Sequence, residues 1–139
     1  MQQQLKDVEH FHKTFKRPVA YKPTLIPSQN FALRYELMKE ENNEYLQACA
    51  DGNLVEIADA LGDKLYILCG TIIEHGMQHL IEDVFAEIQR SNMSKLDENG
   101  QPIIREDGKI LKSNLYKKPD IKSILYPTGE SEDNNLPNV

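Results

Sequence analysis

Apolar residues recur at helical spacing through most of the chain up to residue 92, and breaks in this pattern mark the ends of the predicted elements. The pattern predicts a short amphipathic helix within residues 1–16 and an extended, proline-interrupted connection over 17–27. Two long helices are predicted over 28–49 and 53–75, and a further helix over 78–92. Because only a short turn separates the two long helices, we expect them to pack as an antiparallel hairpin.

The pattern changes after residue 93. Asp107-Gly108 is a strong turn dipeptide, and apolar residues flank it in 103–105 and 109–111, which together predict a small β-hairpin. One helical turn is predicted over 120–125. The segment 128–139 is acidic, rich in Asn and nearly free of apolar residues, so we expect it to be disordered.

These features predict an all-α fold: a helical bundle of about four helices with a short irregular or β-hairpin C-terminal appendix. We expect a single helical domain over residues 1–127, followed by a disordered tail over 128–139. A length of 139 residues with 40% hydrophobic residues fits one globular domain.

Charge and composition exclude several classes of function. The net charge of -6 argues against binding along a nucleic-acid backbone, because such binding depends on neutralising phosphates. The apolar stretches are too short to span a bilayer, and the first residues lack the apolar core of a signal peptide. We therefore expect a cytoplasmic protein with no nucleic-acid partner and no membrane partner. Small phosphorylated ligands remain compatible, since clustered carboxylates hold a divalent cation between protein and phosphate.

The helix predicted over 53–75 carries an acidic stripe on an otherwise apolar surface. With a rotation of about 100° per residue, Glu56, Asp59 and Asp63 fall within about 60° of one another. A helix this apolar is expected to be mostly buried. Its three carboxylates are therefore not expected on an ordinary solvated face.

The preceding helix carries a matching set, since Glu40, Glu41 and Glu44 fall within about 100° of one another. Reflection about the turn places Glu44 level with Asp59, and Glu40 level with Asp63. Such a cluster costs several kcal/mol through repulsion and desolvation unless a counter-charge is present. A divalent cation removes that cost, and Mg2+, with Mn2+ as a possible substitute, is the ion that carboxylates usually hold together with phosphates. The alternative is a set of solvated charges with partners four residues away.

These residues resemble a known signature. Glu40-Glu41-Asn42-Asn43-Glu44, followed after eleven residues by Glu56-Ile57-Ala58-Asp59, is similar to the EExxE…ExxD motif of the all-α nucleoside triphosphate pyrophosphohydrolases. That superfamily includes the MazG-like enzymes, the dimeric dUTPases and phosphoribosyl-ATP pyrophosphohydrolase. The resemblance covers roughly residues 5–95. The proline-rich entry and the appendix fit the MazG-like branch, in which some relatives act on dUTP-type substrates.

The resemblance implies a role for each acidic residue. Glu41, Glu44, Glu56 and Asp59 would hold Mg2+, and Glu40 would be the base that activates or orients the attacking water. Asp63, one turn beyond Asp59, would be either an extra metal ligand or a hydrogen-bond acceptor beside the metal site.

Three residues at the end of the helix predicted over 78–92 are candidates for binding the substrate phosphates, namely Arg90, Asn92 and Lys95. Arg and Lys side chains at such a position meet phosphate directly. The competing interpretation needs no ligand, because cations near a helix C-terminus interact favourably with the helix dipole.

The resemblance implies an Mg2+-dependent hydrolase that converts a nucleoside triphosphate to the monophosphate and pyrophosphate, with nucleotide-pool cleaning of a dUTP-like substrate as one role. Two alternatives stay open. One is phosphoribosyl-ATP hydrolysis, and the other is a non-catalytic helical metal-binding or assembly protein. A homodimer or a dimer of dimers is also expected, since an apolar helix needs contact on several sides.

Overall fold

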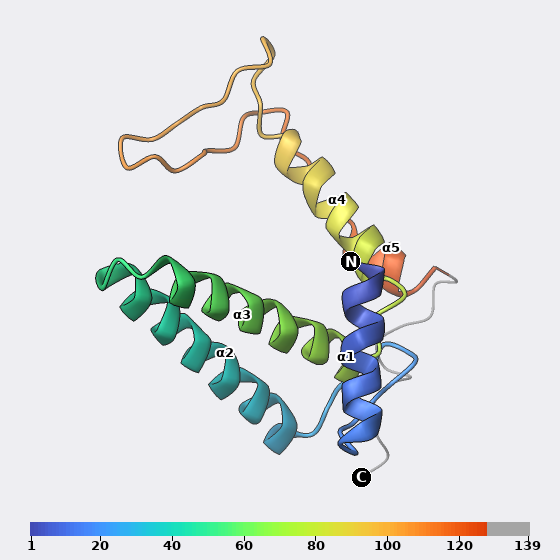
Figure 1. Cartoon of the computed structure of the whole chain (residues 1–139). Coiled ribbons are helices and arrows are strands. Elements are labelled where there is room, and N and C mark those ends of the chain that lie inside the picture. Colours follow the sequence, from blue (N-terminus) through green and yellow to red (C-terminus); the bar gives the residue numbers. More distant parts are fainter. Residues whose placement is uncertain (128–139) are drawn as a thin grey trace. The chain divides into compact units, whose positions relative to one another are not determined.

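The computed structural model describes residues 1–127, and helix is the regular secondary structure throughout this part of the chain. The described residues form two compact units, of which the first covers Met1–His79 and the second begins at Leu80 (Figure 1). The helices are α1 (Gln2–Thr14), α2 (Ser28–Ala50) and α3 (Leu54–Glu74) in the first unit, and α4 (Ile81–Met93) and α5 (Ile121–Leu125) in the second.

The all-α fold class is therefore confirmed. The grouping of residues 1–127 into one domain stays a prediction, and the predicted disorder of 128–139 lies outside the described residues. Among residues 1–127, no helix is both long and apolar enough to cross a membrane.

The predicted α2–α3 hairpin is present (Figure 1). Gly52 makes the turn with a φ of 65°, a left-handed conformation that suits a residue without a Cβ. The Asn53 side chain caps α3, since its Oδ1 accepts hydrogen bonds from the backbone N–H groups of Val55 (3.1 Å) and Glu56 (3.3 Å). This short, capped turn fixes the register in which the two helices face each other.

The buried positions of α2 repeat every seven residues, at Arg34, Glu41 and Ala48. They form a narrow seam against α3, where Ala60 and Gly70 are buried. Two of the three seam residues of α2 are charged, so the α2–α3 interface is not an ordinary apolar core. Arg34, the charged seam residue nearest the start of α2, is paired with Glu74 of α3.

Arg34 joins the first part of α2 to the last turns of α3. Its Nη2 donates to the carbonyl oxygen of Ile67 (2.6 Å), and its Nε donates to the hydroxyl of Thr71 (3.0 Å). Its Nη1 lies 3.6 Å from Oε1 of Glu74, which is 1% exposed. A buried guanidinium with these partners is held in one orientation, and it therefore ties the two helices together at this end.

The connection over residues 17–27 is fastened to the C-terminal end of α3. The N–H of Ala20 donates to the carbonyl of Ile73 (3.1 Å), and the N–H of Thr24 donates to that of His75 (3.0 Å). Gly76, with a φ of 68°, lets the chain pass close to the backbone of Lys22. The proline-rich segment is thus ordered and extended, as its composition predicts.

The expectation that α3 is mostly buried is wrong for its first half in the single chain. Leu54 and Val55 are 77% and 74% exposed, and Leu61 is also exposed. Exposed apolar side chains continue into the second half of α3 at Leu65 and Leu68. The physical reason is coverage: α2 lies along α3, but α1 packs only against the C-terminal half of α3 (Figure 1).

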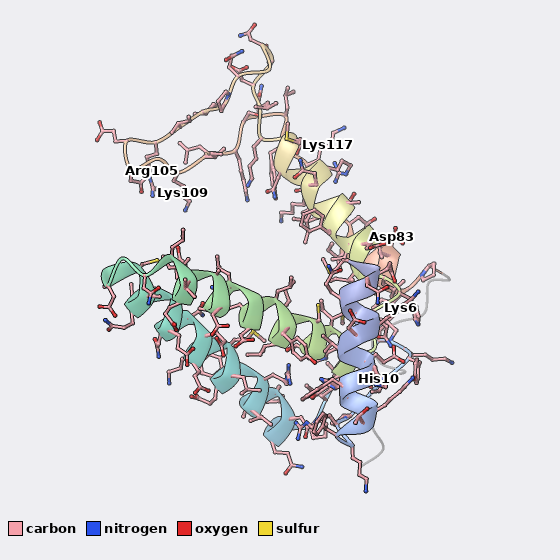
Figure 2. All side chains as sticks on the ribbon, in the orientation of Figure 1. Lys6, His10, Asp83, Arg105, Lys109 and Lys117 are labelled. Carbon is pink, nitrogen blue, oxygen red and sulfur yellow. The ribbon has the colours of Figure 1, made fainter. Side chains whose placement is uncertain are left out.

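In the second unit, the predicted hairpin is reduced to a turn with a single antiparallel bridge between Ile104 and Ile110. The N–H of Arg105 donates to the carbonyl of Lys109 (2.9 Å), and both residues flank the turn in Figure 2. Ile104 and Ile110 are exposed, so no apolar face supports a longer ladder. The helical turn predicted over 120–125 is confirmed as α5.

We predict that Gly76→Ala lowers the free energy of unfolding by about 2–4 kcal/mol, because a Cβ there overlaps the backbone of Lys22 and also strains the left-handed conformation. Gly52→Ala is the matched control. It has nearly the same φ, but its Cβ meets no atom within 4 Å among the described residues, so only about 1 kcal/mol of strain is expected. Urea unfolding of both variants measures the difference, and equal losses would contradict the packing of residues 17–27 against Gly76.

Candidate carboxylate site

The six acidic residues singled out in the sequence lie on the two helices of the hairpin, three on α2 and three on α3. Glu41 is buried, with 9% of its surface exposed, whereas the other five are exposed: Glu40, Glu44, Glu56, Asp59 and Asp63. The set therefore consists of one buried carboxylate with exposed carboxylates around it.

The electrostatics of Glu41 show which acids lie close to it. Burial raises the pKa of the Glu41 carboxyl above its ordinary value, and so do the negative charges of Glu44, Asp63, Glu40 and Asp59. Two of these four neighbours lie on α3. The structure thus brings carboxylates of both helices around Glu41, as the register across the short turn predicts.

Glu41 also carries an unsatisfied atom. Its Oε2 is buried and has no hydrogen-bond partner within residues 1–127. A buried polar atom without a partner is costly, and in native proteins it usually marks a place where an ion, a water molecule or a ligand binds. The oxygen donors around it are all carboxylates, which is the donor type that Mg2+ and Mn2+ select. The residues present therefore fit a hard divalent cation.

The carboxylate oxygens do not converge as the side chains stand. Within residues 1–127, no group of three or more His, Cys, Asp or Glu side chains is close enough to hold a metal ion. Like charges repel, and five of these side chains are free to turn toward solvent. Metal binding by Glu41, Glu44, Glu56, Asp59 and Asp63 stays a prediction, and it requires these carboxylates to turn toward one another.

Glu56 belongs to a neighbouring part of the hairpin. It shares with Glu44 an open pocket of about 390 Å³ at the turn, whereas its charge is not among those that raise the pKa of Glu41. Glu44 takes part in both groups and so connects them. The other residues that line this pocket are Gln47, Ala48, Asp51 and Asn53.

The three candidates for phosphate binding lie in the second unit, at and just beyond the end of α4, and each has a local partner. Both Nε and Nη2 of Arg90 donate to the carboxylate of Glu87 (2.7 Å each), an ion pair that holds the pKa of Glu87 at about 2. Lys95 Nζ donates to Oδ1 of Asn92 (2.8 Å). Their role toward a phosphate stays a prediction. Arg90 Nη1 and the remaining N–H groups of Lys95 are the donors that could meet one while these contacts are kept.

Sequence reasoning missed Arg34, which lies seven residues before Glu41 in the buried seam of α2. The available signal was the seven-residue spacing of Arg34, Glu41 and Ala48, which an apolar pattern does not reveal because two of the three residues are charged. By fixing the start of α2 on α3, Arg34 holds the register on which the position of Glu41 depends.

We predict that Glu41→Gln changes the pH dependence of stability in the metal-free protein. Because the pKa of Glu41 is raised on folding, the folded state binds more protons than the unfolded state does. Wild-type stability therefore falls as the pH rises from the ordinary carboxyl value through the raised pKa of Glu41. The amide removes this dependence and raises the melting temperature at pH 7 in the presence of EDTA. Glu36→Gln, at an exposed position of α2 beside Lys39, is the control. An unchanged pH profile in Glu41→Gln would contradict the clustering of carboxylates.

Comparison with known proteins agrees with this arrangement. A search of curated proteins found no match. The family model described as phosphoribosyl-ATP pyrophosphohydrolase matches residues 8–92, which is more than half of the chain and includes all six acidic residues. Enzymes of this family are pyrophosphohydrolases that act on phosphoric anhydrides, and the family is a member of the all-α nucleoside triphosphate pyrophosphohydrolase superfamily. The chain therefore belongs to the phosphoribosyl-ATP pyrophosphohydrolase family.

Proposed function

We propose that this protein hydrolyses the bond between the α- and β-phosphates of a nucleoside triphosphate, and that phosphoribosyl-ATP is the first substrate to test. The observation that carries the proposal is the buried Glu41 with carboxylates of both helices around it, in a chain of this family. The sequence resemblance alone favours a dUTP-like substrate of the MazG-like branch. The family match favours phosphoribosyl-ATP instead, so the order of the two candidates is reversed.

When bound, Mg2+ would neutralise charge on the phosphate oxygens of the substrate. Glu41, Glu44, Glu56 and Asp59 are the residues that would hold it. Asp63, which is also among the charges acting on Glu41, would be a further ligand or an acceptor beside the site. Each of these roles depends on the carboxylate oxygens turning inward from α2 and α3.

Glu40 is the proposed base. It neighbours Glu41 in sequence but lies about 100° away around α2, so the two carboxylates do not point at one ion equally well. Its side chain is exposed, which leaves it free to meet a water molecule. In the proposed step, Glu40 accepts a proton as the water oxygen bonds to the α-phosphorus, the bond from that phosphorus to the bridging oxygen breaks, and pyrophosphate leaves.

A panel of substrates tests the activity. Pyrophosphate release is measured with phosphoribosyl-ATP, dUTP and the common nucleoside triphosphates, each with Mg2+, with Mn2+ and with EDTA. Metal-dependent release supports the proposal, and the preferred compound identifies the substrate. No turnover of any compound would favour the second candidate, a non-catalytic metal-binding or assembly protein. The cytoplasmic location inferred from the sequence stays a prediction.

We also propose a homodimer or a dimer of dimers, with the exposed apolar side chains at the start of α3 in the interface. Leu54, Val55 and Leu61 are largely exposed in the single chain, and burying such side chains stabilises an assembly. We expect Val55→Glu to shift the mass in analytical ultracentrifugation toward the monomer. Glu36→Lys, a charge change on α2 away from these residues, is the control. A wild-type monomer at micromolar concentration would contradict this proposal.

We predict that Glu40→Gln lowers turnover by about 10²–10⁴, because the amide keeps the shape of the side chain but accepts no proton. Affinity for Mg2+ and for nucleotide is expected to stay within about threefold of wild type. Glu44→Gln, by contrast, is expected to weaken Mg2+ binding. Single-turnover kinetics and calorimetry compare the two variants. If Glu40→Gln weakens Mg2+ binding as much as Glu44→Gln does, Glu40 is a ligand and Asp63 becomes the next candidate for the base.

A further inference from the structure

Two glycines lie within α3, and only one of them has a packing reason. A Cβ at Gly70 would come within 2.7 Å of both Arg34 Nη2 and His12 Nε2. Both side chains are buried and held in place, since Arg34 Nη2 donates to the carbonyl of Ile67 and His12 Nδ1 lies 2.8 Å from the carbonyl oxygen of Pro18. A Cβ at Gly62 would meet no atom within 4 Å among the described residues. Since glycine inside a helix lowers stability relative to alanine, the structure of the single chain leaves Gly62 without a compensating contact.

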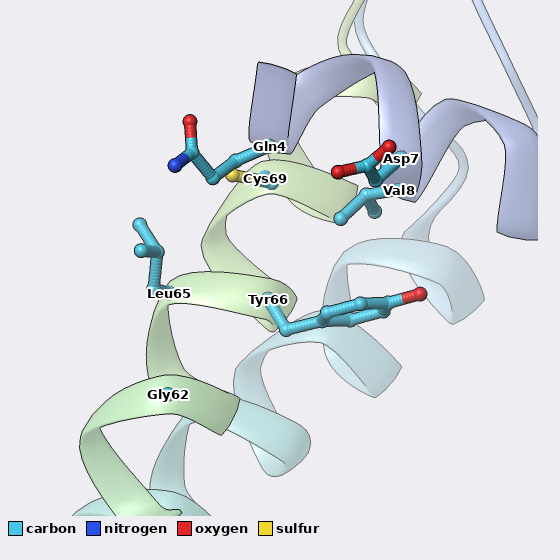
Figure 3. Close-up of a pocket in the computed structure, with 7 residues that line it drawn as sticks. All are labelled: Gln4, Asp7, Val8, Gly62, Leu65, Tyr66 and Cys69. Carbon is cyan, nitrogen blue, oxygen red and sulfur yellow. The ribbon is translucent and has the colours of Figure 1, made fainter. Parts of the chain in front are cut away.

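Gly62 instead lines a pocket of about 190 Å³ between α1 and α3 (Figure 3). Val8 and Cys69, both buried, close its inner side, and Leu65 and Tyr66 extend from α3 beside it. The backbone at Gly62 is bare, so the pocket opens toward the middle of α3. A larger residue there would occupy part of this space.

The walls of the pocket suit a flat ring. The Tyr66 ring is held by an edge-on contact with Phe11, with ring centroids 5.5 Å apart and an interplanar angle of 87°. A ring fixed in this way offers a preorganised surface for stacking. The pocket surface is otherwise mainly apolar, which matches the low polarity of the face of an aromatic heterocycle.

The polar groups lie on the α1 side of the pocket. Asp7 and Gln4 project from α1 in Figure 3, and Asp7 Oδ1 accepts a hydrogen bond from Gln3 (2.9 Å). Burial, and to a lesser extent the charge of Asp7, raise the pKa of the Tyr66 hydroxyl. A carboxylate accepts from ring N–H or exocyclic amino groups, and the Gln4 amide both donates and accepts. The edge of a nucleobase presents such ring N–H and exocyclic amino groups together with hydrogen-bond acceptors.

The pocket and the acidic stripe lie on neighbouring faces of the same helix. Gly62 falls between Asp59 and Asp63 in sequence, and Tyr66 is about 10 Å along the axis from Asp59 at the usual rise per residue. We propose that this pocket receives the base of the nucleotide whose phosphates meet the carboxylates of α2 and α3. This inference rests on the proposed function for the position of the phosphates.

The test fills the pocket without touching the carboxylates. We compare Gly62→Leu with Ala32→Leu, which places the same side chain at an exposed position of α2 that does not line the pocket and lies outside the proposed interface. Calorimetry with Mg2+ measures the binding of three probes: α,β-methylene-ATP, α,β-methylene-dUTP and inorganic tripolyphosphate. We expect Gly62→Leu to weaken the preferred nucleotide analogue at least about tenfold and to leave tripolyphosphate within about twofold. Ala32→Leu should change neither affinity.

Three outcomes overturn the inference, and a fourth concerns the proposed function alone. Equal nucleotide affinity in the two variants would show that the base lies elsewhere. A change of oligomeric mass in Gly62→Leu, with nucleotide affinity per chain unchanged, would show that the pocket is filled by a second copy. If wild type binds neither analogue more tightly than tripolyphosphate, the base makes no contact and the pocket assignment is wrong. If wild type binds an analogue but releases no pyrophosphate from any substrate, only the proposed function fails.

Discussion

Repulsion between the carboxylates of α2 and α3 is the interaction that the other contacts of the first unit must balance. Glu41 is buried in the α2–α3 seam, with negative charges of both helices close enough to raise its pKa. Repulsion across the seam favours separation of the helices, so the hairpin must be held together at other points. Arg34 does this at one end through Ile67, Thr71 and Glu74, and the capped turn does it at the other. The acids lie between these two attachments.

This arrangement explains why a cation is the natural complement of the fold. A divalent ion between α2 and α3 would convert the repulsion into attraction and would give Glu41 Oε2 a partner. Replacing Glu41 with an apolar residue would also remove the repulsion, and replacements of this kind often cost no stability. That the chain keeps Glu41 in the seam is therefore better explained by a ligand than by folding, and the family to which it belongs hydrolyses phosphoric anhydrides.

The sequence predicted the elements that depend on local signals. The Asn53 cap, the glycine turns and the prolines before α2 each act within a few residues, so the ends of α2 and α3 could be placed closely. The grouping of acids from both helices around Glu41 was also predictable, because a short turn and a fixed helical rise leave little freedom. The sequence did not predict that the first half of α3 is exposed in the single chain. Its apolar pattern is the same whether α1 or a second chain covers these residues. Whether the carboxylate oxygens converge depends on the side-chain rotamers. These depend on charge repulsion and on bound ligands, so the sequence alone does not predict them.

The proposed activity requires the carboxylates of α2 and α3 to hold a divalent cation against a nucleotide phosphate. Crystals grown with Mn2+ and a non-hydrolysable nucleotide test this by anomalous scattering, because Mn2+ has the oxygen preference of Mg2+ and is visible by its own signal. We expect an anomalous peak between α2 and α3, coordinated by Glu41 together with carboxylate oxygens of α3 and a phosphate oxygen. A nucleotide bound with its metal elsewhere, or a peak that Glu41 does not coordinate, would contradict it.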